Sequence, residues 1–128
     1  MHRFVWVLQI VLGVYFVAIG VMHFVVPEGL PDQMGWMYDL PTWLHYASGT
    51  AEILGGLGLI LPGLTGIRPQ LTPMAAAGLI IVMVIAAMWH VPRGEAQNVL
   101  ANLVLVAILA FVGYVRWRKL PLRERSTV

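Results

Sequence analysis

The chain has 128 residues, of which 59% are apolar and only 11% are charged. Soluble domains carry about 25% charged residues, so this composition excludes an ordinary soluble domain and indicates an integral membrane protein. The net charge of +2 does not indicate nucleic-acid binding, because the basic residues gather toward one end of the chain.

The first predicted membrane span covers residues 4–26 and ends at Pro27. At about 1.5 Å per residue it is long enough to cross a bilayer. It exceeds the roughly 7–15 apolar residues of a secretory signal and lacks a small-residue cleavage site after it, so we expect it to be retained. Gly13, Gly20 and His23 share one helical stripe. Small residues line faces where membrane helices approach closely, so His23 should face the bundle.

The connection over residues 28–41 is polar, acidic and free of Lys and Arg. It contains Trp36 and Tyr38 among methionines, which predicts a short amphipathic segment at the membrane interface. The second predicted span covers residues 42–61 and is expected to end at Pro62.

The second span carries a carboxylate in a glycine-rich, apolar run. An ionised carboxylate at bilayer depth costs roughly 2.5–3.5 kcal/mol on insertion scales, so such residues usually face inward toward partners. His45, Gly49, Glu52 and Gly56 fall on one face at helical spacing. We therefore expect Glu52 to lie where a neighbouring helix comes close.

The third and fourth predicted spans cover residues 73–91 and 96–117, followed by a basic tail over residues 118–128. Met83 and His90 share a stripe of the third span, and Trp89 marks its interfacial end. Asn98 and Asn102 lie one turn apart on the fourth span. The basic residues at the end of the chain are expected to anchor it on anionic lipid: Arg116, Arg118, Lys119, Arg123 and Arg125.

The charge pattern also predicts the orientation. All Lys and Arg residues except Arg93 lie at the N-terminus, in the turn between spans two and three, or near the C-terminus. The positive-inside rule then places both termini in the cytoplasm. The prediction is one all-α domain over residues 1–128, an integral membrane four-helix bundle with a short interfacial segment between its first two spans.

Strongly polar residues sort onto the outer halves of these spans, whereas the inner halves contain only Gln9. We predict that they form a polar pocket, in which Glu52, His23 and His90 exchange protons with a ligand. His45, Asn98 and Asn102 are predicted to contribute to ligand binding. The alternative is structural, because interhelical hydrogen bonds worth about 0.6 kcal/mol also hold membrane bundles together.

Three segments of the sequence resemble the DoxX and DoxX-like family of small four-span bacterial membrane proteins. They are Gly20–Phe24 with Pro27, the more specific block Gly49–Pro62, and Ala86–His90 followed by Asn98. The resemblance implies a four-helix bundle in the bacterial inner membrane, with the second-span glutamate, here Glu52, as a recurrent feature. It also implies a link to quinone- or thiol-linked redox systems, because some relatives are subunits of thiosulfate:quinone oxidoreductase or accompany oxidative-stress proteins.

These features favour a redox-associated subunit that binds a quinone or another lipid-soluble molecule, with the bilayer and a redox or oxidative-stress protein as partners. A non-catalytic lipid-binding or assembly protein is the main alternative, and an acid–base lipid isomerase is a further one. A haem or divalent-metal site at His23 and His90 is less favoured, because no close-spaced pair such as His-x3-His occurs and no metal is predicted. The lack of cysteine excludes a thiol step by this chain itself.

Overall fold

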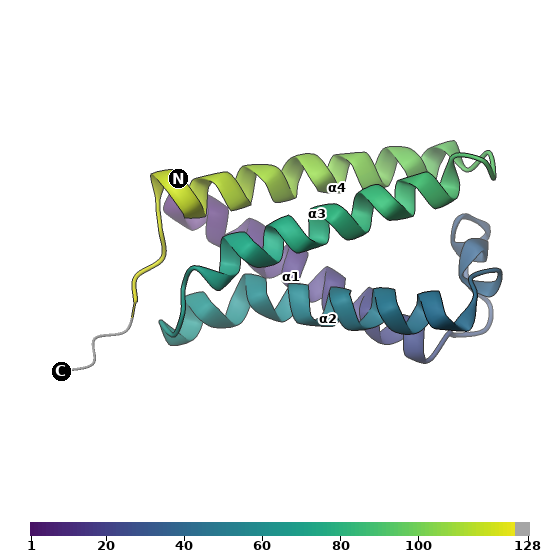
Figure 1. The fold of residues 1–128 in the computed structure, drawn as a ribbon, viewed down its shortest axis with the longest axis horizontal. Helices are drawn as coiled ribbons and strands as arrows, with labels where there is room; N and C mark the ends of the chain where they lie inside the picture. The colour runs from purple at the N-terminus through teal and green to yellow at the C-terminus, as the bar shows by residue number, and fades with distance from the viewer. Residues whose placement is uncertain (125–128) are drawn as a thin grey trace.

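The computed structural model describes residues 1–124, which contain helices and no strands. The chain has four long helices. They run along one axis, with a short helix at one end (Figure 1). The elements are α1 (His2–Phe24), the 3-10 helix η1 (Asp32–Tyr38), α2 (Thr42–Thr65), α3 (Leu71–His90), α4 (Ala96–Tyr114) and the π-helical turn η2 (Val115–Lys119). The four long helices are apolar enough to cross a membrane, so the predicted membrane fold is confirmed.

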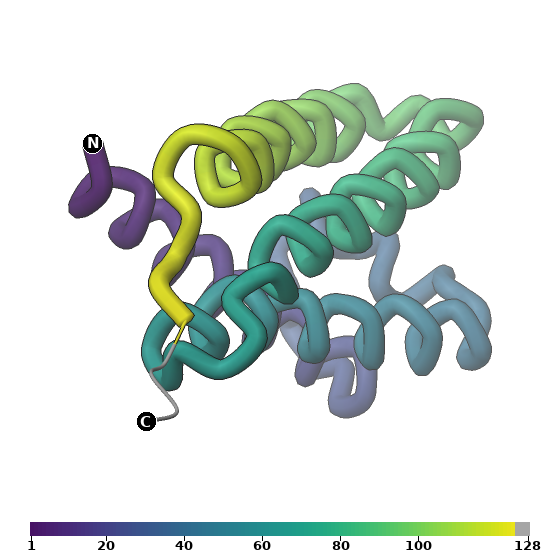
Figure 2. Tube along the Cα trace, turned by 60° about the vertical axis from the view of Figure 1, so that its left-hand side comes forward, coloured from purple at the N-terminus to yellow at the C-terminus, as the bar shows by residue number. Residues whose placement is uncertain are grey.

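The four helices pack as two pairs, α1 with α2 and α3 with α4. The pairs are joined mainly through α2 and α3, whereas α1 and α4 touch sparsely. In Figures 1 and 2 the pairs lie close together near η2 and spread apart toward η1. We call the two ends of the molecule the η1 end and the η2 end. The bundle is therefore a wedge that is tightest at the η2 end.

Facing glycines let the backbones of α1 and α2 come into contact. A Cβ atom on Gly20 would lie 2.8 Å from the carbonyl oxygen of Gly49, and one on Gly56 would lie 2.6 Å from that of Gly13. Such small-residue interfaces are typical of membrane helix pairs, where close packing replaces the hydrophobic effect. The predicted glycine stripes are thus confirmed as the contact between the first two spans.

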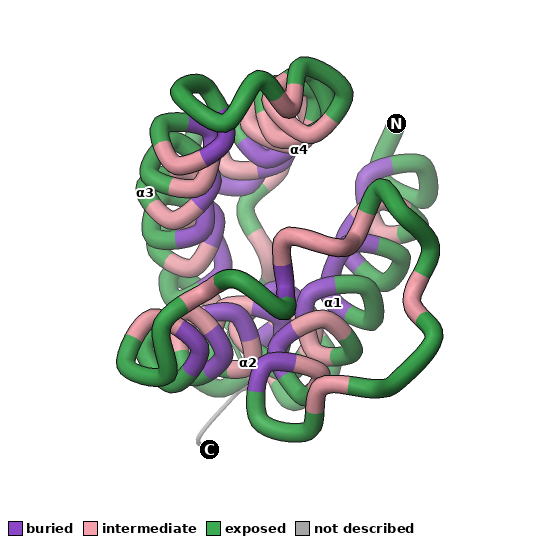
Figure 3. Tube along the Cα trace, turned by 90° about the vertical axis from the view of Figure 1, so that its right-hand side faces the viewer, coloured by how far each residue is buried: buried purple, intermediate pink, exposed green. Residues whose placement is uncertain are grey.

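The apolar core fills the middle of the bundle and its η2 end. It includes Phe16, Leu59, Leu79 and Leu109, each from a different helix and each almost fully buried. Figure 3 shows the buried residues on the inward faces of the helices and exposed residues on their outer faces. Many of the exposed side chains are large and apolar, as expected for surfaces that contact lipid.

The second span is longer than predicted, because α2 continues through Pro62 to Thr65. Proline has no N–H to bond the carbonyl four residues earlier, which is why the sequence pointed to a helix end there. That carbonyl, of Gly58, instead accepts a 2.9 Å hydrogen bond from the Thr72 hydroxyl of α3. The helix ends at Gly66, whose φ of 69° is left-handed and favours glycine.

The end of the fourth span also differs from the prediction. Helical structure continues to Lys119, and Arg116 is buried rather than spread on a lipid surface. Arg118, Lys119 and Arg123 are exposed, as a membrane anchor requires. Arg125 lies outside the described residues.

Candidate functional site

A cavity of about 540 Å³ lies between the two helix pairs at the η1 end. Its walls come from α1, α2, α3 and the segment around η1, and α4 contributes Asn102. The lining is mostly apolar, and its polar side chains include Tyr15, His23, Glu52 and His90. Two other lining residues, Trp43 of α2 and Met88 of α3, are each 68% exposed on the outer surface. The cavity therefore reaches the lipid-facing surface between α2 and α3.

The carboxylate of Glu52 faces His23 across the glycine contact between α1 and α2. Their side chains are only 5% and 2% exposed, and Oε2 of Glu52 lies 3.3 Å from Nε2 of His23. The two atoms are within ion-pair distance but are not aligned as a hydrogen bond, so Oε2 has no hydrogen-bond partner among the described residues. The predicted close approach at Glu52 thus brings two buried titratable groups together at the cavity wall.

His45 lies behind His23 rather than on the cavity wall. The Nδ1 atoms of the two rings are 2.9 Å apart, and Nε2 of His45 is 2.9 Å from the main-chain carbonyl oxygen of Met37 in η1. His45 is buried, although it lies in the first turn of α2. It is buried because the segment containing η1 folds back over the start of α2.

His90 faces the cavity from the end of α3. Its Nδ1 lies 2.9 Å from Oε1 of Glu95, the residue that precedes α4. Two hydrogen bonds lower the pKa of the Glu95 carboxyl, and the one from Arg93 has a larger effect than the one from His90. Glu95 is therefore ionised at neutral pH and accepts from Nδ1, which leaves the other ring nitrogen of His90 for a molecule in the cavity.

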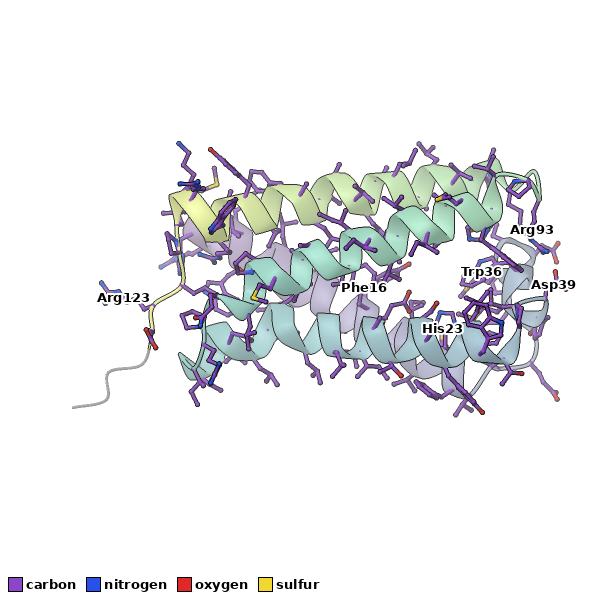
Figure 4. The ribbon with its side chains drawn as sticks, in the orientation of Figure 1. Phe16, His23, Trp36, Asp39, Arg93 and Arg123 are labelled. Carbon is purple, nitrogen blue, oxygen red and sulfur yellow. The ribbon has the colours of Figure 1, made fainter. Side chains whose placement is uncertain are left out.

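Helix η1 closes the end of the cavity and contacts both helix pairs. The ring of Trp36 lies between the rings of His23 and His90, with centroid distances of 5.9 and 5.2 Å. Arg93 donates to Asp39 at 2.6 Å and to Glu95 at 2.8 Å, which ties the end of η1 to the α3–α4 turn. Figure 4 shows Trp36 and His23 inside this end of the molecule and the Arg93–Asp39 contact at its edge.

The two asparagines of α4 have different surroundings. Nδ2 of Asn98 donates to the main-chain carbonyl of Gln33 at 3.1 Å, so Asn98 holds the η1 segment and does not line the cavity. Asn102 lines the cavity, and its buried Nδ2 has no hydrogen-bond partner among the described residues.

The sequence analysis did not predict a site role for Trp36, Tyr15 or Trp89. Trp89 was read only as an interface marker, but its buried Nε1 has no hydrogen-bond partner among the described residues, and its side chain lines the cavity. Its spacing from Val82 and Ala86, two other lining residues, places it on the same helical stripe. That periodicity could have identified Trp89, whereas Trp36 depends on how η1 folds back.

Across residues 1–124, no group of three His, Cys, Asp or Glu side chains is arranged to hold a metal ion. The site instead presents buried polar atoms without protein partners, on Glu52, Trp89 and Asn102, in otherwise apolar surroundings. This arrangement suits a largely apolar molecule with a polar head.

Comparison with known proteins agrees with these structural features. No curated protein and no solved structure matches the chain. The family model described as the DoxX-like family matches residues 7–112, which include all of α2 and α3, most of α1 and α4, and the whole cavity wall. The chain is therefore a membrane protein that belongs to the DoxX-like family.

Proposed function

We propose that this protein is a redox-associated membrane subunit that binds a quinone, or a similar lipid-soluble molecule with a polar head, in the cavity at the η1 end. The observation that carries the proposal is the set of buried polar atoms without partners on Glu52, Trp89 and Asn102. Leaving such an atom unsatisfied costs about 1–3 kcal/mol, so a bound polar head that pairs with them gains that energy.

The size and position of the cavity support the same ligand class. A volume of about 540 Å³ is within the range of roughly 300–1,000 Å³ that is usual for small-molecule sites. The exposed lining residues Trp43 and Met88 give a ligand a direct path from the bilayer. A quinone ring offers carbonyl oxygens as acceptors for the Trp89 and Asn102 donors, and its tail can remain among lipids.

The orientation is part of this proposal. The basic residues Arg3, Arg68, Arg118 and Lys119 lie at the η2 end or in the turn near it, and the η1 end is acidic apart from Arg93. By the positive-inside rule the cavity faces the outer side of the bacterial inner membrane, and both termini are cytoplasmic. A redox partner protein supplies or removes the electrons.

Quinone content of the purified protein tests the proposal. Protein extracted in mild detergent should retain quinone, and Glu52→Gln should lower the retained amount by about tenfold, as expected for the loss of one hydrogen bond between the Glu52 carboxyl group and the polar head. Glu28→Gln, the same change at an exposed loop residue, is the matched control and should retain as much as the unchanged protein.

Equal quinone content in the Glu52→Gln protein and the unchanged protein contradicts a quinone site at Glu52. A stoichiometric partner protein that co-purifies with both would then favour the assembly function. Native mass spectrometry of the same samples reports quinone, lipid and protein partners together.

A further inference from the structure

An apolar groove with a volume of about 330 Å³ runs between α2 and α3, which lie side by side over this stretch (Figure 1). Its walls are formed by residues within 51–58 of α2 and 71–79 of α3, from the middle of the bundle toward the η2 end. Leu54 and Met74 on its rim are each 64% exposed, so the groove is open to lipid along one side. We call it the α2–α3 groove.

The α2–α3 groove continues the cavity of the η1 end along the same two helices. On α2, Ala47 lines the cavity and Ala51 lines the groove. On α3, Val82 lines the cavity and Gly78 lines the groove. Four residues separate the members of each pair, so they lie one turn apart on the same face of their helix. The cavity and the groove therefore adjoin along the contact between α2 and α3.

Small residues leave the groove unfilled. Leu79 packs so closely on Gly55 that an added Cβ would lie 2.5 Å from its side chain, and a Cβ on Gly58 would lie 2.7 Å from that of Ala75. These contacts close the floor of the groove. A Cβ on Gly78, by contrast, would meet no atom of the described residues within 4 Å. Because packed structures leave few voids, hydrocarbon from outside the chain must fill this space in a membrane.

The groove has the dimensions of one hydrocarbon chain. Residues 71–79 rise by about 12 Å along α3, so the mean cross-section of the groove is about 30 Å². Hydrocarbon chains in contact lie about 4–5 Å apart, so one chain needs about 20 Å² and two need about 40 Å². An extended chain advances by about 1.25 Å per carbon, so the groove holds about ten carbons in line, or about two to three isoprene units of about 5 Å each.

The polar head of a cavity ligand lies deep in the bilayer. Glu52 is about 15 Å along α2 from Thr42, which is half of the roughly 30 Å thickness of the hydrocarbon layer. A charged phospholipid head at that depth carries a large energetic cost, so the cavity selects a small uncharged head. A chain attached to this head continues toward the η2 end, where the groove runs.

We infer that the α2–α3 groove is the tail subsite of the cavity, and that the ligand accordingly carries a single long apolar chain on a small uncharged head. This inference rests on the proposed function. Because the bound head already holds one end of the chain, the tail loses less freedom on entering the groove than a free lipid chain does. Close packing supplies the stabilisation, since the tail moves into the groove from lipid and not from water.

The dependence of binding on chain length tests the inference. Ubiquinones with one and with four isoprene units are compared in lipid nanodiscs by quenching of tryptophan fluorescence. Each quinone is expressed as a mole fraction of the lipid, so that its partition into the bilayer does not contribute. A single unit is about as long as one helical turn and ends at the entrance of the groove. The four-unit quinone should therefore bind the unchanged protein about fivefold more tightly.

Gly78→Leu places a side chain in the groove at a position where its Cβ meets no described atom. It should weaken binding of the four-unit quinone by about fivefold and leave binding of the one-unit quinone within about twofold, which also shows that the variant is folded. A single methyl group at this position would leave most of the groove open. Ala77→Leu enlarges the neighbouring exposed residue of α3, outside the groove, and should alter neither quinone.

A second measurement uses the unchanged protein and so does not depend on the folding of a variant. The probe is a ubiquinone whose chain of about ten carbons ends in a diazirine, which places the reactive group within the groove. Irradiation should attach the label to residues within 51–58 and 71–79, and unlabelled four-unit quinone should prevent the labelling. Mass spectrometry of the peptides locates the label.

The outcomes separate the two proposals. If Gly78→Leu binds the four-unit quinone as the unchanged protein does, or if the label spreads evenly over the outer faces of the helices, the tail subsite is wrong and the quinone site stands. If Gly78→Leu loses both quinones, the labelling of the unchanged protein decides. If the unchanged protein binds neither quinone, the proposed function is wrong and the tail subsite falls with it.

Discussion

At the residue scale, Arg116 shows how this chain accommodates a buried cation. Its side chain is 2% exposed, and among residues 1–124 no carboxylate lies within ion-pair distance of it. Neutral groups surround it instead. Nε donates to Oε1 of Gln9, Nη1 donates to the carbonyl of Leu120, and the ring of Trp6 lies 5.7 Å away. Gln9 also donates to the Leu59 carbonyl at 2.8 Å, so one amide links α1, α2 and η2.

Gln9→Leu should therefore destabilise the protein. It leaves Nε of Arg116 without an acceptor and removes the side-chain donor to the Leu59 carbonyl, and an unsatisfied group of this kind costs about 1–3 kcal/mol, more when it is charged. We expect a loss of about 2–4 kcal/mol in the free energy of unfolding, measured by denaturation in detergent micelles. The double variant with Arg116→Met should recover part of this loss, because it removes the buried charge as well.

Gln97→Leu makes the same substitution on an exposed position of α4 and serves as the control. It should change the free energy of unfolding by less than about 0.5 kcal/mol. An equal effect of the two glutamine substitutions would mean that Gln9 contributes through helix propensity or lipid contact, and not through Arg116.

At the scale of the elements, the contact between α1 and α2 determines the geometry of the site. Gly20 lies three residues before His23, and Gly49 lies three residues before Glu52. The contact between the two glycines is therefore one helical turn from the contact between His23 and Glu52. The sequence was sufficient to predict this pairing, because glycine and polar residues share one helical stripe in each span. It was not sufficient to predict the position of His45, whose burial depends on the fold of η1.

Gly20→Ala should separate α1 from α2 and weaken the site. The added Cβ would lie 2.8 Å from a carbonyl oxygen and 3.0 Å from the Ile53 amide nitrogen, and both are backbone atoms that cannot rotate away. We expect a loss of about 1–3 kcal/mol in stability, as for other overpacked positions, together with reduced quinone retention.

Gly78→Ala is the matched control for this substitution. Gly78 lies inside α3, and a Cβ there would meet no atom within 4 Å. Because alanine favours helices over glycine by about 1 kcal/mol, this variant should be as stable as the unchanged protein or more stable. If both glycine variants retain quinone equally, the close approach at Gly20 does not position the site.

At the scale of the whole molecule, four apolar spans and their order could be predicted from hydropathy alone, because a bilayer requires long apolar helices. The wedge between the two helix pairs could not be predicted. The separation of the two helix pairs depends on which helix faces meet. Glycines bring the backbones of α1 and α2 into contact, whereas no stripe of glycines brings α1 against α4. The end of α2 could not be predicted from Pro62 for a related reason. The Gly58 carbonyl, which proline cannot bond, accepts its hydrogen bond from Thr72 of another helix.

The closure of the cavity by η1 should depend on pH through Glu95. Hydrogen bonds from Arg93 and His90 lower the pKa of the Glu95 carboxyl. The contacts of ionised Glu95 therefore stabilise the folded position of η1 at any pH above the ordinary pKa of glutamate. This stabilisation is lost as the pH falls through the lowered pKa of the folded state. Arg93→Gln should increase amide hydrogen exchange in η1 by about two- to fivefold at neutral pH, since partly exposed ion pairs each contribute less than about 1 kcal/mol.

The Arg93→Gln protein should also lose much of the pH dependence of this exchange in the acidic range. Arg68→Gln changes the exposed arginine in the turn between α2 and α3 and should leave exchange in η1 unaltered. Unchanged exchange in the Arg93 variant would mean that Asn98 and His45 suffice to hold η1 in place.

The Thr72–Gly58 hydrogen bond beside Pro62 has a mechanical consequence. It fastens α3 to α2 near the η2 end, while the opposite ends of the same helices flank the cavity. A helix of 20 residues, the length of α3, is about 30 Å long, so each degree of tilt at the fastened end moves the other end by about half an ångström. A difference of a few degrees in the angle between α2 and α3 at this bond therefore corresponds to a difference of about 1–2 Å in the width of the cavity.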